Sequence, residues 1–115
     1  MIAVCTCGIS VSAQVSFNVA PDRNAKATMA MLTRHEELSE AAFINTAQTL
    51  SDYYKEISAI HFDNSLPAES AKAKSAQSAK ALNEKLKAIL TRAQMETWIN
   101  TVQPEIEKQL WDNSN

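Results

Sequence analysis

Glycine, proline and cysteine are scarce in this 115-residue sequence, which contains one Gly, three Pro and two Cys. Hairpin turns depend on residues that tolerate a positive φ angle, so a single glycine argues against a loop-rich or all-β fold. Basic residues are not in excess either, because the net charge is -2, and this argues against a general affinity for nucleic acid. The length suits one domain, and the composition predicts an all-α fold.

Both cysteines, Cys5 and Cys7, lie in the uncharged segment 1–13. This segment is a short apolar stretch that ends in the small-residue pattern of a signal-peptide cleavage site after Ala13. It is shorter than the about 20 apolar residues that a membrane-spanning helix needs. We therefore expect a signal peptide over 1–13, a periplasmic or secreted mature protein without thiols, and no integral membrane segment after processing.

Two other interpretations of segment 1–13 remain open. Its β-branched residues would suit a buried N-terminal strand. Cys5 could instead be the acylated residue of a lipoprotein, although Val4 is larger than the residues that lipoprotein processing prefers at that position. The segment also has no Lys or Arg before its apolar stretch, which agrees with a natural start further upstream.

The rest of the chain shows helical periodicity. We expect a lead-in over 14–24 that is extended or disordered, a single helical domain over 25–111, and a frayed tail over 112–115. The longest periodic run is 34–62, and its apolar stripe consists of Phe43, Ala47, Leu50, Tyr54, Ile57 and His61. A turn at 63–67 leads to a second long helix over 66–90, and Pro104 is expected to kink or restart the last helix.

Two long helices joined by a short turn must run antiparallel, so the pattern predicts a long α-hairpin with short flanking helices folded back at its two ends. The second arm is rich in alanine over 68–81 and offers little apolar area. Burial of apolar surface contributes about 25 cal/mol per Å², so such a hairpin gains little free energy to offset the conformational entropy that the chain loses on folding. We therefore expect a homodimer.

The flanking helices are predicted to begin at two similar motifs. Each motif has a leucine, a threonine and, three residues later, an acid or an amide: Leu32, Thr33 and Glu36, and then Leu90, Thr91 and Gln94. The threonine hydroxyl can accept from a first-turn N–H, while the later side chain reaches back to the N–H of the threonine. In the second copy, Leu90 can also pack on Met95. The sequence therefore predicts two capping-box corners.

The repeated Leu-Thr-x-x-Gln motif, together with the signal peptide and the hairpin, resembles the periplasmic Spy/CpxP family of LTxxQ-motif proteins. The match is complete at Leu90, Thr91 and Gln94, whereas Glu36 replaces the glutamine of the first copy. The resemblance implies an ATP-independent chaperone or an envelope-stress adaptor that acts as a hairpin dimer on unfolded or partner proteins. It also implies that the motif residues are structural corners and not catalytic groups.

Charge is distributed unequally between the two long helices, because acidic residues predominate in the first. The second is basic, with Lys72, Lys74, Lys80, Lys85, Lys87 and Arg92 as possible client-binding residues. A basic helix could steer acidic or unfolded clients to the protein. Alternatively, the two helices complement each other's charge, or their charged faces are simply solvated.

The weak candidates for a metal site are His35, His61 and Asp63. A structural zinc site needs four ligands and no cysteine remains after processing, so we expect no metal or other cofactor. His61 fits better as a partly buried, hydrogen-bonded histidine of the apolar stripe. The sequence has no nucleophile motif and no glycine-rich phosphate loop, so we do not expect an enzyme. Besides a chaperone, a zinc-responsive sensor or buffer and a structural or partner-inhibiting helical protein remain alternatives.

We expect the exported protein to begin at Gln14, because the cleavage pattern ends at Ala13. N-terminal sequencing or intact mass of the protein from the envelope fraction tests this prediction. A mature protein that keeps Cys5 would instead favour the buried strand or the lipoprotein.

Overall fold

Every element that the structure describes is a helix. The computed structural model describes residues 14–112, so the predictions for 1–13 and 113–115 lie outside the described residues. The elements are α2 (Pro21–His35), α3 (Glu40–His61), α4 (Ala68–Lys87), α5 (Arg92–Thr97), the π-helical turn η1 (Trp98–Val102) and α6 (Gln103–Asp112). Residues 14–112 contain no strand, which confirms the predicted all-α class. Within this range, no helix is both long and apolar enough to cross a bilayer.

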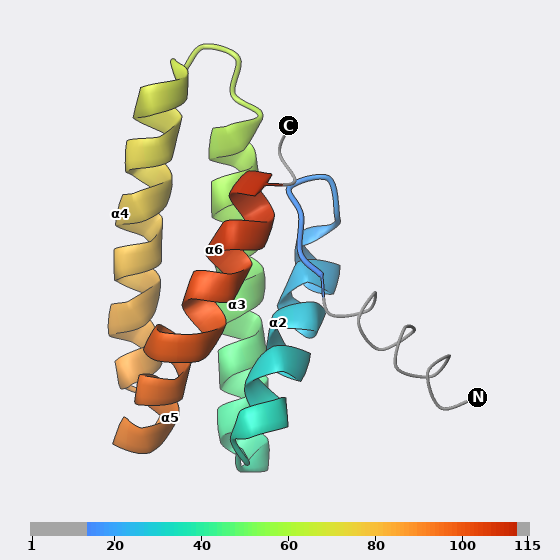
Figure 1. Cartoon of the computed structure of the whole chain (residues 1–115), viewed down its shortest axis with the longest axis vertical. Coiled ribbons are helices and arrows are strands. Elements are labelled where there is room, and N and C mark those ends of the chain that lie inside the picture. The colour runs from blue at the N-terminus through green and yellow to red at the C-terminus, as the bar shows by residue number, and fades with distance from the viewer. Residues whose placement is uncertain (1–13, 113–115) are drawn as a thin grey trace, which may run out of the picture.

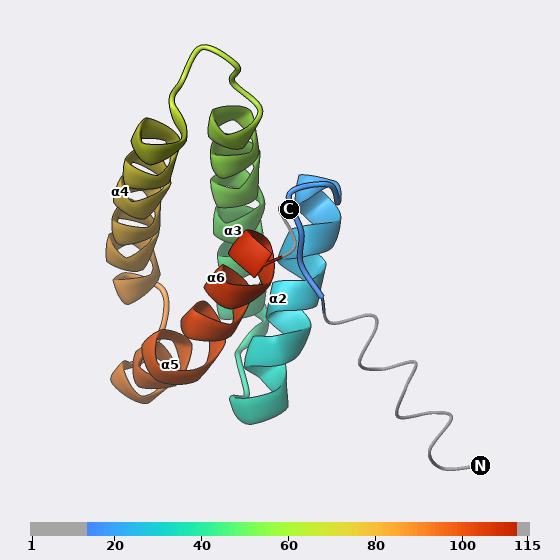
Figure 2. The same ribbon diagram turned by 45° about the horizontal axis from the view of Figure 1, so that its top comes forward.

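The helix α3 lies between α2 and α4 (Figure 1). It ends at the loop at the top of this view, and α4 returns beside it from the same loop. The C-terminal segment of α5, η1 and α6 begins at the far end of α4 and crosses over α3 toward α2 (Figures 1 and 2). The core is therefore enclosed between the three longer helices and the C-terminal segment.

The core confirms most of the predicted stripe of α3. Leu50, Tyr54 and Ile57 are buried, but the prediction is wrong for Phe43, which is 43% exposed. Residues of α2 beside Phe43, such as Ala30 and Thr33, are too small to cover it. The other large buried side chains are Leu32 of α2, Leu86 of α4, Trp98 of η1, and Ile106 and Leu110 of α6.

Buried hydroxyl groups join α2 to α3. The hydroxyls of Thr28 and Tyr54 are 2.6 Å apart, and both side chains are fully buried. Burial raises the pKa of Tyr54 far above its ordinary value, so this hydroxyl stays protonated in the core. Nearer the start of α2, the Ser51 hydroxyl donates to the carboxylate of Asp22. These pairs fix the register of α2 on α3.

The predicted lead-in over 14–24 is wrong in its second half. The helix α2 begins at Pro21, so residues 21–24 form its first turn. Proline suits this position because the N–H groups of the first turn have no helical partner, and its fixed φ angle is already close to the helical value.

Residues 14–20 are held in place by side-chain amides of two helices. The Gln109 Oε1 atom of α6 accepts from the N–H of Val15 at 2.8 Å. From α2, the Asn24 Oδ1 atom accepts from the N–H of Ser16 at 3.1 Å, and Asn24 Nδ2 donates to the Ser16 carbonyl at 2.8 Å. Within the segment, the N–H of Val19 donates to the Ser16 carbonyl at 3.1 Å, and the side-chain amides pair further backbone groups, so Val15 can be buried.

The last helix widens into a π turn just before a proline. The N–H of Gln103 donates to the carbonyl of Trp98, and Pro104 follows directly without an N–H to donate. The sequence predicts a kink or a restart of the helix at Pro104, and the structure has the π-helical turn η1 just before this residue. In an α-helix, residues five apart are separated by roughly 140° around the axis. A turn closed by an i to i+5 bond places such residues nearly above one another, so Trp98 and Gln103 project to the same side.

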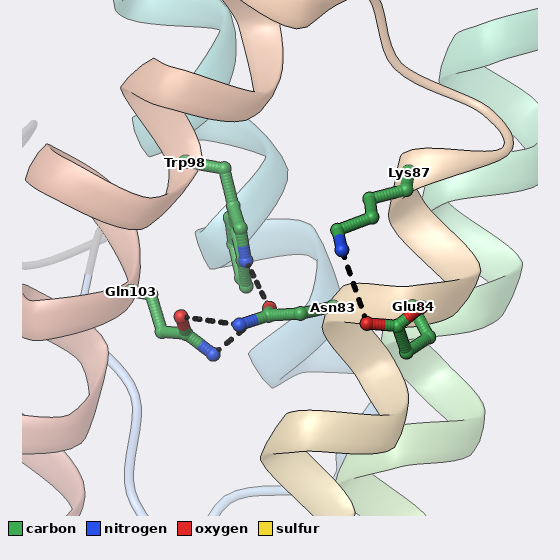
Figure 3. Close-up of polar contacts among 5 residues, drawn as sticks. All are labelled: Asn83, Glu84, Lys87, Trp98 and Gln103. Carbon is green, nitrogen blue, oxygen red and sulfur yellow. Dashed lines mark hydrogen bonds and ion pairs between the residues drawn. The ribbon is translucent and has the colours of Figure 1, made fainter.

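Trp98 and Gln103 converge on Asn83 of α4 (Figure 3). The indole Nε1 of Trp98 donates to Asn83 Oδ1 at 2.8 Å. Gln103 Nε2 donates to the same oxygen at 3.1 Å, and Asn83 Nδ2 donates to Gln103 Oε1 at 3.0 Å. The two amides are thus paired in both directions, and the indole N–H is satisfied. This network fixes the C-terminal segment against α4.

We expect Asn83→Ala to destabilise the protein by about 1–3 kcal/mol, because it leaves the Trp98 N–H and the Gln103 amide without their partner. The matched control is Glu84→Ala, since Glu84 makes only an exposed ion pair with Lys87 at 3.1 Å (Figure 3). Such pairs contribute ~0–1 kcal/mol. Urea denaturation followed by circular dichroism measures both variants, and equal losses would contradict the assigned role of Asn83.

Candidate functional site

The second motif forms the corner that its sequence predicts. The Thr91 Oγ1 atom accepts from the N–H of Gln94 at 3.2 Å, and Gln94 Oε1 accepts from the N–H of Thr91 at 2.9 Å. Both hydrogen bonds of a capping box are therefore present, and the predicted N-cap of α5 is confirmed. Leu90 and Met95, which flank the cap, are both buried.

The first motif is not a capping corner, so this prediction is wrong. The helix α2 continues through Thr33 to His35, and the Thr33 hydroxyl donates to the Met29 carbonyl at 2.8 Å. The next helix, α3, is capped by Ser39, whose Oγ accepts from the N–H of Ala42 at 3.1 Å. The predicted corner therefore lies several residues further along the chain.

The continuation of α2 through Thr33 has both local causes and a packing cause. A threonine inside a helix can donate to the carbonyl four residues back, so its hydroxyl finds a partner without ending the helix. Leu32 is fully buried and holds this part of α2 on the core. Arg34 and His35 place basic side chains in the last turn, where the negative end of the helix dipole favours them.

The two motifs nevertheless meet in space. The Gln94 Nε2 atom donates to the Glu37 carbonyl at 2.9 Å, and the Thr97 hydroxyl donates to the Glu36 carboxylate. Glu36 is thus a bridging residue and not a capping residue, while Gln94 both caps α5 and bridges. We call these four residues, Glu36, Glu37, Gln94 and Thr97, the motif bridge. It ties the α2–α3 connection to the start of α5.

The structure does not bring the three metal candidates together. His35 ends α2, whereas His61 ends α3 at the opposite end of that helix. The ring of His61 is half-buried and stacked on Phe17, with centroids 3.9 Å apart and planes 5° apart. Asp63 Oδ1 accepts from the N–H and the hydroxyl of Ser65, and these bonds lower the pKa of Asp63. Over residues 14–112, no three His, Cys, Asp or Glu side chains are grouped so that they could hold a metal ion.

The basic residues of the second long helix occupy different sides of the molecule. Helical spacing places Lys72, Lys80 and Lys87 on one flank of the buried face of α4, Lys74 and Lys85 on the other, and Arg92 at the start of α5. All six are exposed. Arg92 lies 4.0 Å from Glu96 in an exposed ion pair. A client-binding role for these residues stays a prediction, but they do not form one continuous basic surface.

An open cavity lies between α2 and α3, and we call it the α2–α3 groove. It has a volume of about 690 Å³. Its apolar lining consists of Ala25, Met29, Ala30, Phe43, Ile44 and Ala47. The two largest of the exposed side chains in this lining are Phe43, which is 43% exposed, and Ile44, which is 57% exposed. The groove therefore presents an aromatic and a branched aliphatic side chain to solvent next to a floor of small residues.

The groove also carries charge. Lys26 of α2 and Lys55 of α3 belong to its lining, and within residues 14–112 neither has an ion-pair partner. The third charged residue of the lining, Asp22, accepts the hydrogen bond from Ser51. The charged lining is thus net positive, which favours acidic groups on a bound molecule.

Reasoning from the sequence placed Phe43 in the core and did not use Ile44. The adjacent large apolar residues Phe43 and Ile44 gave no clear signal, because a helix stripe can include neighbouring residues. In the same helix, the adjacent residues Tyr53 and Tyr54 are both buried. The small residues of α2 that leave the groove open could not be matched to Phe43 before the packing of α2 on α3 was known.

The fold and the groove define a small all-helical protein with an open apolar groove. No protein-family model matches the chain, and neither a curated protein nor a solved structure is significantly similar to it. The resemblance to the Spy/CpxP family therefore rests on the motif residues and not on overall similarity.

We expect Thr91→Ala to destabilise the protein by roughly 1 kcal/mol, which is the usual cost of losing an N-cap. Thr33→Ala is the matched control, because the Thr33 hydroxyl bonds only within its own helix. This substitution should stay within about 0.5 kcal/mol of the parent protein. Thermal unfolding of both variants tests this prediction. An unchanged unfolding midpoint for Thr91→Ala would show that the cap does not contribute to the stability of the protein.

Proposed function

We propose that this protein is a non-enzymatic binding protein whose α2–α3 groove holds short apolar segments of unfolded or partner proteins. The observation that carries the proposal is the exposure of Phe43 and Ile44 beside an open apolar floor. Burying a large apolar side chain is favourable by ~1.5–3 kcal/mol, so a groove of this kind gains free energy when an apolar segment covers it. Contiguous exposed apolar surface commonly marks an interaction site.

The chemistry of the groove suits reversible binding of many different segments. Apolar burial has no directional requirement, so it does not demand a defined sequence. The floor of small residues accepts side chains of several shapes, and Met29 adds a flexible side chain that adapts to them. Binding of this type consumes no nucleotide, which agrees with the ATP-independent chaperone that the motif suggests.

The Spy/CpxP resemblance supplies the proposed setting. We place the protein in the periplasm or outside the cell, as a chaperone or an envelope-stress adaptor. In this proposal, α3 and α4 act as the two arms of a hairpin, and a second copy completes a homodimer because α4 offers few bulky side chains. The exposed basic residues of α4 and Arg92 would raise the encounter rate with acidic clients by long-range attraction.

The mature protein should suppress the aggregation of an unfolded model protein when it is present in several-fold molar excess, as measured by light scattering. The double substitution Phe43→Ser and Ile44→Ser should abolish most of this suppression, because it removes the exposed apolar side chains of the groove. Phe62→Ser is the matched control, since Phe62 is 56% exposed but lies outside the groove lining.

Circular dichroism establishes that each variant keeps its helical content. Full suppression by the double variant would exclude the groove as the binding surface. Absence of suppression by the unsubstituted protein would reject the chaperone function itself.

A further inference from the structure

A second cavity lies between α4 and α6, above α3, and we call it the α4–α6 crevice. Its volume is about 270 Å³. The helices α4 and α6 diverge as they leave the corner at α5 (Figures 1 and 2). The lining of the crevice includes Lys72, Ser75 and Ala76 from the first half of α4, and Leu110 and Trp111 from the end of α6. Its apolar floor includes Phe17, Ile57 and Leu110, which are 4%, 1% and 2% exposed. The crevice shares no lining residue with the α2–α3 groove.

A buried hydroxyl of the crevice has no partner. Ser75 of α4 is only 7% exposed, and its Oγ atom makes no hydrogen bond with any described residue. Leaving such a group unpaired typically costs about 1–3 kcal/mol. Ser75 belongs to the crevice lining but its Oγ atom is itself buried, so a polar ligand atom bound there satisfies the hydroxyl once the side chain turns toward the crevice.

Two opposite charges line the same crevice without pairing. Glu107 of α6 is half-buried and has no hydrogen bond or ion pair with residues 14–112, and burial raises its pKa. Tyr53 and Glu107 both line the crevice, and the charge of Glu107 helps to raise the pKa of Tyr53, after the larger effect of burial. On the α4 side, the Lys72 Nζ atom lies 5.8 Å from the ring centroid of Trp111. The crevice therefore has a carboxyl group on one wall and an ammonium group on the other.

We propose that the α4–α6 crevice binds a small zwitterion with an apolar body, namely a free α-amino acid with an apolar side chain. The ammonium group of the ligand pairs with Glu107. Its carboxylate pairs with Lys72 and accepts from the Ser75 hydroxyl. Its side chain lies on the apolar floor beside Phe17 and Ile57.

The dimensions and the charges select this class of ligand. Small-molecule pockets commonly measure ~300–1,000 Å³, so a crevice at the lower limit suits a molecule of amino-acid size better than a peptide or a larger cofactor. A simple carboxylate would leave the charge of Glu107 unpaired, and a simple amine would leave Lys72 and Ser75 unused. Glu107 is half-buried, and a charge removed from water is costly without a partner, so a ligand whose ammonium group pairs with Glu107 is favoured over a simple carboxylate. The exposed Lys72 adds attraction for a carboxylate on the same ligand.

The experiment titrates the full chain with L-leucine and follows the ¹H–¹⁵N spectrum. We expect saturable shifts at residues of the crevice, with the groove residues unaffected. 3-Methylbutylamine lacks the carboxylate, 4-methylpentanoate lacks the ammonium group, and glycine lacks the apolar side chain. Each of these should bind at least about tenfold more weakly. The absence of saturable shifts with L-leucine, or equal affinity for any of the three analogues, would overturn the proposal.

Substitutions in the chain assign the contacts. Glu107→Gln and Lys72→Gln should each weaken L-leucine binding at least about tenfold. Lys74→Gln is the matched control, because Lys74 lies on the other flank of α4, and it should leave the affinity unchanged. Ser75→Ala removes the unpaired hydroxyl, so it should weaken binding without lowering the thermal stability of the free protein. Unchanged affinity in both Glu107→Gln and Lys72→Gln would reject the charge pairing.

Discussion

The hydrogen bond from the Trp98 indole to Asn83 is the interaction on which the rest of the structure depends. Trp98 is the largest fully buried side chain, and its N–H must find a partner once it leaves water. Asn83 accepts that bond and also pairs in both directions with Gln103. The π turn makes this possible, since it brings Trp98 and Gln103 to the same side of the last helix. The position of α6, and with it the α4–α6 crevice, follows from the burial of one tryptophan.

Much of the fold follows from the sequence because it is encoded in local patterns. The all-α class follows from the composition, in which glycine is scarce. The apolar stripe through Leu50, Tyr54 and Ile57 and the capping box at Thr91 each involve residues within a few helical turns of one another. The prediction at Thr33 failed because the same local pattern permits two outcomes: a hydroxyl that caps a new helix, or one that bonds back within the old helix. Tertiary packing of Leu32 favours the second.

The candidate site was much less predictable. The groove exists because Ala25 and Ala30 of one helix lie opposite Phe43 and Ile44 of another, and no sequence spacing relates these positions. The motif bridge likewise joins residues that no sequence spacing relates. Its hydrogen bonds join Gln94 to Glu37 and Thr97 to Glu36, so they link the motifs in a way that no capping rule describes. Local rules identify which residues can bond, whereas the packing of helices decides with which partner.

Both open surfaces have the same physical origin. Helix α2 contains three alanines, and α4 carries many alanine and serine residues, so both helices fill little of the space beside the bulkier side chains of their neighbours. Where small residues of α2 face Phe43, the α2–α3 groove remains, and where Ser75 and Ala76 of α4 face α6, the α4–α6 crevice remains. The bulky buried residues, Trp98 among them, form one core cluster that leaves both surfaces open. A chain that used larger residues at these positions would gain burial and lose both cavities, so the small side chains are the feature that the proposed binding at either site requires.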